Sequence, residues 1–361
     1  MIDQLAPIET ILDDAKAGRM FILVDDEDRE NEGDLVIPAE HANAQAINFM
    51  ATYGRGLICL PMQSAQIRKI GLPPMAKHNS SRHETAFTVS IEAREGVTTG
   101  ISAADRACTI AAAINPDVKT TDIATPGHIF PLEARDGGVL VRAGHTEAAV
   151  DISRLAGLNP SGVICEIMRD DGEMARLPDL IPFAKEHGLN IASIADLIAY
   201  RRKNEKLVSR THSAPFDCAY GSDFTLHLYT GQLHYAEHIA LVKGDVTSVD
   251  APLVRMHALD VLTDVLQDAS NQRSGQLQRA IEKVNHASCG VIVLLRVPRP
   301  DVLSGKLAGD YKKTNDLKEY GIGAQILKDI GVKQMTLLTN NPKQVVGLDG
   351  YGLEIVGYEG I

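Results

Sequence analysis

An acidic run between two apolar segments is the first feature of this sequence that could do chemistry. The run, DDEDRENEGDL at residues 25–35, holds eight ionisable side chains, of which seven are acidic. MFILV before it and LVIPAE after it are typical of buried strands. A divalent cation such as Mg²⁺, which prefers oxygen ligands, would relieve the repulsion among the carboxylates, and Gly33 would let the backbone turn sharply. The alternative is a solvated surface loop.

RAGHTEA, at residues 142–148, is the second such feature. We expect it where a strand, VLVR at 139–142, passes into a helix, whose first N–H groups would be free to bind an anion. Arg142 adds a bidentate grip suited to phosphate, Thr146 adds a hydroxyl, and His145 could bind a metal or move protons. The alternative reading makes Thr146 a helix N-cap and His145 a surface residue.

Two further segments each contain one residue suited to acid–base chemistry. In TPGHIFPL, residues 125–132, two prolines are expected to hold His128 on a rigid loop. In GVICEIM, residues 162–168, Glu166 lies within an apolar strand, where burial would raise its pKa toward neutrality. A structural histidine and a strand-end glutamate facing water are the alternatives. A third segment, TTGISAADR at 98–106, places Ser102 and Asp105 at a helix start, which helix capping largely explains.

Mixed helices and strands must position these residues. Apolar spacing predicts helices at 8–17, 41–52, 101–114 and 177–189, and strands at 20–26 and 56–61, without a regular βαβ rhythm. A basic polar segment followed by THSAPFD, which has turn character, predicts a linker near 200–217. We therefore expect an α+β architecture: a mixed first domain over residues 1–205 and a smaller α/β domain over 206–361.

Composition narrows the class of protein. A net charge of −11 argues against nucleic acid as the main partner. The first residues do not resemble a signal peptide, and no apolar run is long enough to span a membrane. The five cysteines are scattered and form no CxxC pair, which favours a cytoplasmic protein with reduced thiols.

The acidic run, GISAADR, TPGHIFPL, RAGHTEA and GVICEIM, in this order, closely resemble the signatures of the 3,4-dihydroxy-2-butanone 4-phosphate synthase family. The resemblance covers roughly residues 5–205. It implies conversion of ribulose 5-phosphate to 3,4-dihydroxy-2-butanone 4-phosphate and formate for riboflavin biosynthesis, with Mg²⁺ or Mn²⁺. It also implies a homodimer formed through the first domain.

The resemblance also assigns roles to individual residues. Glu30 and His145 would hold the metal. The substrate would be contacted by Arg29, Glu30, Asp34, Arg142, Ala143, Gly144, His145, Thr146 and Glu166. The catalytic residues would be His128, Glu166, Asp34 and Glu32. Cys59 is equally well read as a residue lining the site and as a buried apolar residue.

Residues 206–361 resemble GTP cyclohydrolase II, with departures at the zinc site. That family holds catalytic zinc with three cysteines, but Asp260 stands where the first would be, in VRMHALDVLTD. QDASNQRSGQLQ, at 267–278, contains none. Without thiolate ligands the zinc site cannot assemble, so we expect no zinc and no cyclohydrolase activity in this domain. A bifunctional enzyme and a regulatory or scaffolding protein are the alternatives.

Overall fold

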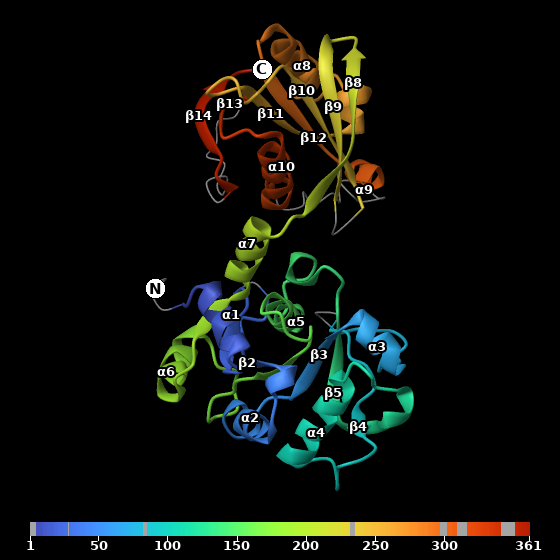
Figure 1. Cartoon of the computed structure of the whole chain (residues 1–361), viewed down its shortest axis with the longest axis vertical. Helices are drawn as coiled ribbons and strands as arrows, with labels where there is room; N and C mark the ends of the chain where they lie inside the picture. Colours follow the sequence, from blue (N-terminus) through green and yellow to red (C-terminus); the bar gives the residue numbers. More distant parts are fainter. Residues whose placement is uncertain are drawn as a thin grey trace. The chain divides into compact units, whose positions relative to one another are not determined.

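The protein folds as two compact units, Met1–Arg201 and Arg202–Ile361. A computed structural model describes residues 5–27, 29–81, 85–231, 235–296, 302–308, 316–340 and 351–361, without the side chains of 316–320. Asp28 of the acidic run therefore lies outside the described residues. Both units combine helices with a sheet, as expected from the sequence (Figure 1). None of the helices in the described ranges is both long and apolar enough to cross a membrane.

The first unit is a seven-stranded sheet with helices on both faces. Its strands are β1 Phe21–Val24, β2 Gly33–Pro38, β3 Cys59–Gln63, β4 Ile91–Ala93, β5 Ile123–Ala134, β6 Gly162–Glu166 and β7 Ile191–Ser193. Its α-helices are α1 Ile8–Lys16, α2 Ala44–Phe49, α3 Ser64–Ile70, α4 Ala103–Ile114, α5 His145–Leu155, α6 Leu177–His187 and α7 Ile194–Asn204. Short helical turns are η2 Ala39–His41, η3 Met50–Gly54, η4 Thr120–Asp122 and η5 Gly138–Leu140.

The central strands are buried on both faces, which explains their unbroken apolar runs. Every residue of β1 and β2 is buried. Ile22 and Leu35 pack into one hydrophobic cluster with α2, α4 and α6. Phe21 and Leu23 pack into a second cluster with α1, α5 and α7. Successive residues of a strand point to opposite faces of the sheet, and here helices cover both faces. If every second strand residue were polar, the helices on one face would have no apolar side chains to pack against.

Strand order brings distant parts of the sequence to one end of the sheet. The order is β4-β5-β3-β6-β2-β1-β7. β1 and β2 form an antiparallel hairpin whose connection is the acidic run. β6 pairs antiparallel with β2, in a register that sets Asp34 opposite Glu166. The end of the sheet that carries the acidic run therefore also carries Glu166.

Three local predictions are wrong. VLVR is not a strand: Val139 lies in the turn η5, because the positive φ angles of Gly137 and Gly138 break the extended chain and the Asp151 carboxylate accepts the Val139 N–H at 2.8 Å. His128 lies within strand β5 and not on a loop. Gly33 begins β2 and makes no sharp turn; it is required because a Cβ there would lie 2.3 Å from a methyl group of Leu180.

The second unit is another seven-stranded sheet, in the order β14-β13-β11-β12-β10-β9-β8. Its strands are β8 Val208–Cys218, β9 Gly221–Gly231, β10 Glu237–Lys243, β11 Leu253–Ala258, β12 Gly290–Leu295, β13 Gln334–Leu338 and β14 Glu354–Glu359. Its helices are α8 Gln276–His286, α9 Val302–Ala308 and α10 Asp316–Ile330, with the π-helical turn η6 Val261–Val265. Two hydrophobic clusters form its core, one containing Leu327 of α10 and the other Ile281 of α8.

The predicted long linker between the halves is also wrong. α7 continues to Asn204 and β8 begins at Val208, so THSAPFD lies inside a strand. Gln325 explains the ordered chain between them: its side-chain amide donates to the carbonyls of Arg202 and Glu205 and accepts from the Leu207 N–H. A tertiary contact from more than a hundred residues downstream therefore organises a segment of low apolar content.

Candidate active site

Asp25 organises the acidic loop between β1 and β2. One of its oxygens accepts the Glu32 N–H at 2.8 Å, and the other accepts the Glu30 N–H at 3.1 Å and Arg29 Nη1 at 2.7 Å. Its side chain is 1% exposed. The sequence did not distinguish this carboxylate from its neighbours; the buried apolar strand directly before it was the available signal. Asp25 therefore folds the loop that presents Glu30.

Arg176 holds the same loop from the opposite side. Its Nη1 donates to the carbonyl of Glu30 at 2.7 Å and also to the carbonyl of Asn31. Asn31 has a φ of 56°, a left-handed conformation that asparagine tolerates better than most residues. The guanidinium of Arg176 lies 3.9 Å from a carboxylate oxygen of Glu32. Sequence reasoning missed Arg176, which precedes α6 and lies about 145 residues from its partners.

His145 lies at the first turn of α5 with its imidazole buried at 5% exposure. Its Nε2 lies 3.2 Å from the carbonyl oxygen of Leu23, which can only accept a hydrogen bond. Nδ1 faces Glu30 Oε2 and Asp34 Oδ1, each at 3.9 Å. Burial lowers the pKa of the imidazole, so it is neutral with its Nδ1 lone pair directed at the two carboxylates. The reading of His145 as a surface residue is therefore wrong.

These donor atoms fit a divalent cation. Two ligand atoms that each lie ~2.1 Å from Mg²⁺ can be at most about 4.2 Å apart, and both distances from Nδ1 fall within that limit. Asp34 Oδ1 is buried without a hydrogen-bond partner among the described residues. Within the described part of the chain, one group of potential ligands has donor atoms that all lie within 4.8 Å of one another, namely Asp25, Glu30 and His145. Both oxygens of Asp25 already accept backbone N–H groups of the loop, so Glu30 and His145 are the better candidates.

Burial and mutual repulsion shift the protonation of two acidic groups here. The pKa of Asp34 is raised well above its usual range, by burial first and then by the negative charges of Glu166, Glu32 and Glu30. The pKa of Glu32 is raised by burial and by Glu30, and Arg176 opposes the shift. A cation would reverse this repulsion by neutralising the carboxylates that cause it.

Glu166 ends β6 with its carboxylate held by backbone. Its Oε2 accepts the Leu57 N–H at 2.8 Å, and burial raises its pKa. Gly56 allows this contact, because a Cβ at that position would lie 2.6 Å from Oε2. Cys59 lies nearby: it is buried, and burial followed by the charges of Glu166 and Asp34 raises the pKa of its thiol. Glu166 is therefore partly buried with its carboxylate held by backbone, and its raised pKa favours a role in proton transfer.

Two guanidinium groups converge at the N-terminus of α5. A Cβ on Gly144 would lie 2.4 Å from Arg142 Nη1 and 3.0 Å from Arg29 Nη2. Arg142 is held by the buried carboxylate of Glu147 at 2.7 Å. The N-cap of α5 is Gly144, without a side-chain hydrogen bond, so the reading of Thr146 as an N-cap is wrong.

Of the neighbouring residues in RAGHTEA, Ala143 is exposed and Thr146 is buried at 5% exposure. Two cations and the first N–H groups of an eleven-residue helix make this corner suitable for a phosphate group.

His128 lies on β5 apart from the acidic loop. Its side chain is 42% exposed, and its hydrogen-bond partner among the described residues is Glu92, at 2.6 Å. The structure therefore joins Glu30, Asp34, His145 and Glu166 but shows no hydrogen bond or ion pair between His128 and that group, as far as the described residues extend.

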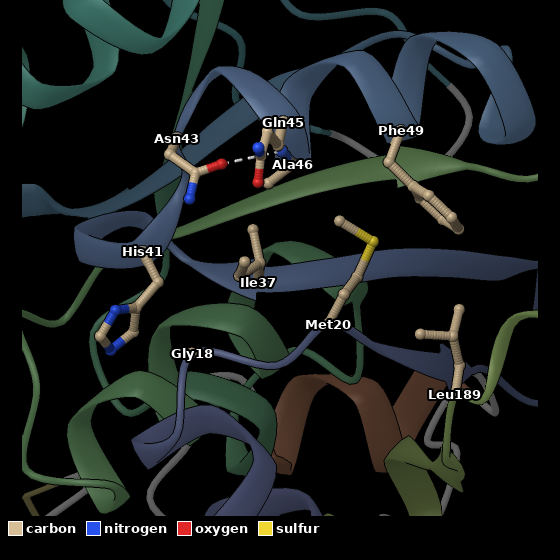
Figure 2. Close-up of a pocket in the computed structure, with 9 residues that line it drawn as sticks. All are labelled: Gly18, Met20, Ile37, His41, Asn43, Gln45, Ala46, Phe49 and Leu189. Atoms are coloured by element: carbon tan, nitrogen blue, oxygen red, sulfur yellow. Dashed lines mark hydrogen bonds between the residues drawn. The ribbon is translucent and has the colours of Figure 1, made fainter.

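A cavity of about 220 Å³ lies elsewhere, at the opposite end of the β1–β2 hairpin. Figure 2 shows Met20, Phe49 and Leu189 on one side of it and the polar side chains of His41 and Asn43 on the other. Asn43 caps α2 through the Ala46 N–H, drawn as a dashed line. No carboxylate lines this cavity, so it is not part of the candidate active site.

Comparisons with known proteins match each half of the chain to a protein family. The 3,4-dihydroxy-2-butanone 4-phosphate synthase family model matches residues 9–200, and the GTP cyclohydrolase II model matches residues 209–360. A 3,4-dihydroxy-2-butanone 4-phosphate synthase from Neisseria meningitidis is 48% identical over 99% of both chains. The riboflavin biosynthesis protein RibBA of Aquifex aeolicus is 47% identical over 97% of this chain and 90% of its own.

Two solved structures are similar as well. The crystal structure of RibBX from A. baumannii, a two-domain 3,4-dihydroxy-2-butanone 4-phosphate synthase, covers 98% of this chain and 99% of its own, with a TM-score of 0.80 and 42% identity. A 3,4-dihydroxy-2-butanone 4-phosphate synthase in complex with two magnesium ions covers 56% of this chain and 99% of its own, with a TM-score of 0.54 and 38% identity. On these matches, the chain belongs to the 3,4-dihydroxy-2-butanone 4-phosphate synthase family.

Proposed function

We propose that the first unit converts ribulose 5-phosphate to 3,4-dihydroxy-2-butanone 4-phosphate and formate, the reaction named by its family, with Mg²⁺ held by Glu30 and His145. The approach of His145 Nδ1 to the carboxylates of Glu30 and Asp34, each at 3.9 Å, carries this proposal. Glu30 comes from the loop between β1 and β2, Asp34 from β2 and His145 from the start of α5, and family membership alone would not require that Nδ1 face both carboxylates. A solved relative with two magnesium ions supports the same metal; Mn²⁺, a similar oxygen-preferring cation, is the expected substitute.

The two arginines select a phosphorylated substrate. Arg29 and Arg142 flank Gly144 at the N-terminus of α5. Because Glu147 fixes Arg142 in place, its guanidinium is oriented before the substrate arrives. We infer that the phosphate of the ketose binds here and that its carbonyl and hydroxyl groups extend toward Glu30 and Asp34.

The buried acids provide the proton transfers. Forming an enediol from a ketose removes a proton next to the carbonyl, and the later dehydration and rearrangement need further transfers in the same pocket. Burial raises the pKa values of Glu166, Asp34 and Glu32, so each holds a proton more readily than an ordinary carboxylate. When bound, the cation would stabilise the negative charge that develops on the substrate oxygens. His128 is the remaining catalytic residue that the resemblance implies.

Formate release from ribulose 5-phosphate, measured with and without Mg²⁺, tests this proposal. We expect turnover that depends on Mg²⁺ and is lost in Glu30→Gln while the protein stays folded. Glu27→Gln is the matched control: it removes the same charge from the same run, but Glu27 is exposed. His145→Ala should also lose metal-dependent turnover. Wild-type protein without turnover in Mg²⁺ or Mn²⁺ would favour a scaffolding protein and would contradict the proposal.

We also propose that the second unit has no GTP cyclohydrolase II activity. Asp260, at the position of the family's first zinc cysteine, accepts the Leu262 N–H at 3.1 Å and pairs with Lys306 at 2.5 Å. Its carboxylate is therefore committed to capping η6 and to an ion pair. Cys218 ends β8 and Cys289 directly precedes β12, and all five cysteines are free. The solved relative described as a two-domain synthase supports this reading.

Metal analysis and a GTP assay test the second unit. We expect no stoichiometric zinc and no formate release from GTP, with a zinc-containing cyclohydrolase assayed in parallel as the control. Stoichiometric zinc with GTP turnover would instead support the bifunctional enzyme. The homodimer and the cytoplasmic location stay predictions; light scattering of the purified protein checks the first, and fractionation of cells checks the second.

A further inference from the structure

We propose that Glu92, on β4, is a positioning residue that holds the His128 imidazole in a single orientation and tautomer. This inference rests on the proposed function, because it gives His128 a role in the same reaction. His128 Nδ1 lies 2.6 Å from Glu92 Oε2, and the same oxygen accepts the His128 backbone N–H at 3.1 Å. Two bonds from one residue to one carboxylate oxygen fix the ring relative to its own backbone.

The carboxylate of Glu92 is itself anchored. Its other oxygen, Oε1, accepts the hydroxyl of Thr109 from helix α4 at 3.0 Å. Thr109 is fully buried and its hydroxyl also accepts the Ala93 N–H at 3.1 Å, so it cannot rotate freely. The Glu92 side chain is only 14% exposed. Hydrogen bonds thus connect Thr109 on α4, Glu92 on β4 and His128 on β5.

The segment 98–106 packs against the Glu92–His128 pair through Gly100. A Cβ on Gly100 would lie 2.1 Å from Glu92 Oε2 and 2.6 Å from His128 Nδ1, and its φ of 87° also favours glycine. The buried carboxylate of Asp105 holds the Gly100 N–H at 3.0 Å and the Thr98 hydroxyl at 2.8 Å. From the sequence, helix capping alone explained Ser102 and Asp105. In the structure, Asp105 also holds the backbone of Gly100 beside the Glu92–His128 pair.

This arrangement determines which ring nitrogen is available. A carboxylate accepts hydrogen bonds and cannot donate them, so Nδ1 carries the proton that faces Glu92. In the neutral imidazole, Nε2 then has the lone pair, on a side chain that is 42% exposed. Without the carboxylate, a free imidazole would exchange tautomers and rotate, and only part of the population would present a basic nitrogen to substrate.

Enzyme kinetics and nitrogen-15 spectra of the full-length protein test the role of Glu92. In the formate assay at saturating Mg²⁺, Glu92→Met, which keeps the side-chain length but removes the acceptor, should lower kcat by roughly 10–100-fold, the range found for residues that orient metal-ligating histidines. KM and the Mg²⁺ concentration for half-maximal activity should change less than about twofold, since Glu92 contacts neither the proposed metal ligands nor the proposed phosphate site. Glu95→Met, at an exposed glutamate three residues away, is the matched control and should leave kcat unchanged.

The spectra report the tautomer directly. With the imidazole in its neutral form, at alkaline pH, His128 of the wild type should show a protonated Nδ1 and an unprotonated Nε2, and Glu92→Met should lose that signature. A neutral ring protonated at Nε2 in the wild type, or an unchanged kcat in a folded Glu92→Met protein, would overturn the inference. The wild-type spectrum decides the matter even if the variant fails to fold. Absence of turnover in the wild type would instead count against the proposed reaction, and the spectrum would still test Glu92.

Discussion

Replacing Arg176 with methionine should weaken Mg²⁺ binding although Arg176 is not a metal ligand. Methionine keeps much of the apolar stem but removes the guanidinium that donates to the carbonyls of Glu30 and Asn31. The Glu30 carboxylate, which is the expected ligand, is attached to the backbone that this guanidinium holds. Without it, the left-handed conformation of Asn31 loses its tertiary support.

The size of the effect follows from the geometry. A hydrogen bond from a charged donor contributes roughly 1.5–3 kcal/mol. The Arg176 side chain is 40% exposed, so water compensates for part of the loss. We therefore expect the competent loop conformation to lose about 1–2 kcal/mol, since both carbonyls share one donor nitrogen. If the metal binds only that conformation, the Mg²⁺ concentration for half-maximal activity should rise about 5–30-fold.

Magnesium titration of formate release gives the comparison. At saturating Mg²⁺ the variant should approach the wild-type kcat, because the ligands themselves are intact. Arg169→Met is the matched control: Arg169 precedes the same helix and is 43% exposed, but its ion pair is with Asp171. Half-saturation within twofold of wild type in a folded Arg176→Met protein would refute the reasoning. An equal shift in Arg169→Met would refute it as well, since the effect would then not depend on the carbonyl contacts.

Two further predictions concern other parts of the molecule. Gly56→Ala should reduce kcat more than about tenfold with little change in Mg²⁺ affinity, because the new Cβ would displace the Glu166 carboxylate. Gly360→Ala is the control in the same assay, because a Cβ there would meet no atom closer than 3.5 Å. In the second unit, burial and Arg296 lower the pKa of His238 to about 4, and its Nδ1 accepts the Arg296 N–H. The unfolded chain binds that proton near pH 6.5, so stability should fall by up to about 3 kcal/mol as pH drops from about 6.5 to about 4. Denaturant titrations should show this slope, and His238→Asn should flatten it; a slope unchanged in the variant would contradict the assignment.

The segments with candidate catalytic residues could be found from the sequence because each has polar residues next to an apolar stretch. The acidic run stands out between two buried strands, and Glu166 stands out inside another. The structure shows Glu30 and His145 facing one another, and their roles as ligands stay a proposal. What the sequence could not supply are the contacts that act across the fold. In the sequence, Asp25 and Arg176 cannot be told from other charged residues, because their hydrogen bonds to the acidic loop form only in the folded protein.

The structural errors share one physical cause. Val139 to Val141 are β-branched or aliphatic, so local propensity favours a strand, but two glycines with positive φ and the distant Asp151 carboxylate impose a turn. The segment with His128 contains two prolines, which favours a loop, yet β5 pairs with both β3 and β4. In each case pairing or hydrogen bonding with residues far along the chain overrides the local preference.

The position of β6 has a consequence for how the protein is made. β6 lies between β3 and β2, although it is synthesised more than a hundred residues after β2. At ribosomal rates of roughly 5–20 residues per second, the apolar edges of β2 and β3 wait on the order of ten seconds for the strand that joins them. During that interval the nascent chain has its acidic loop but neither His145 nor Glu166. The half-made first unit therefore has unpaired strand edges until β6 is synthesised, and the proposed metal site cannot form before His145 has joined the acidic loop.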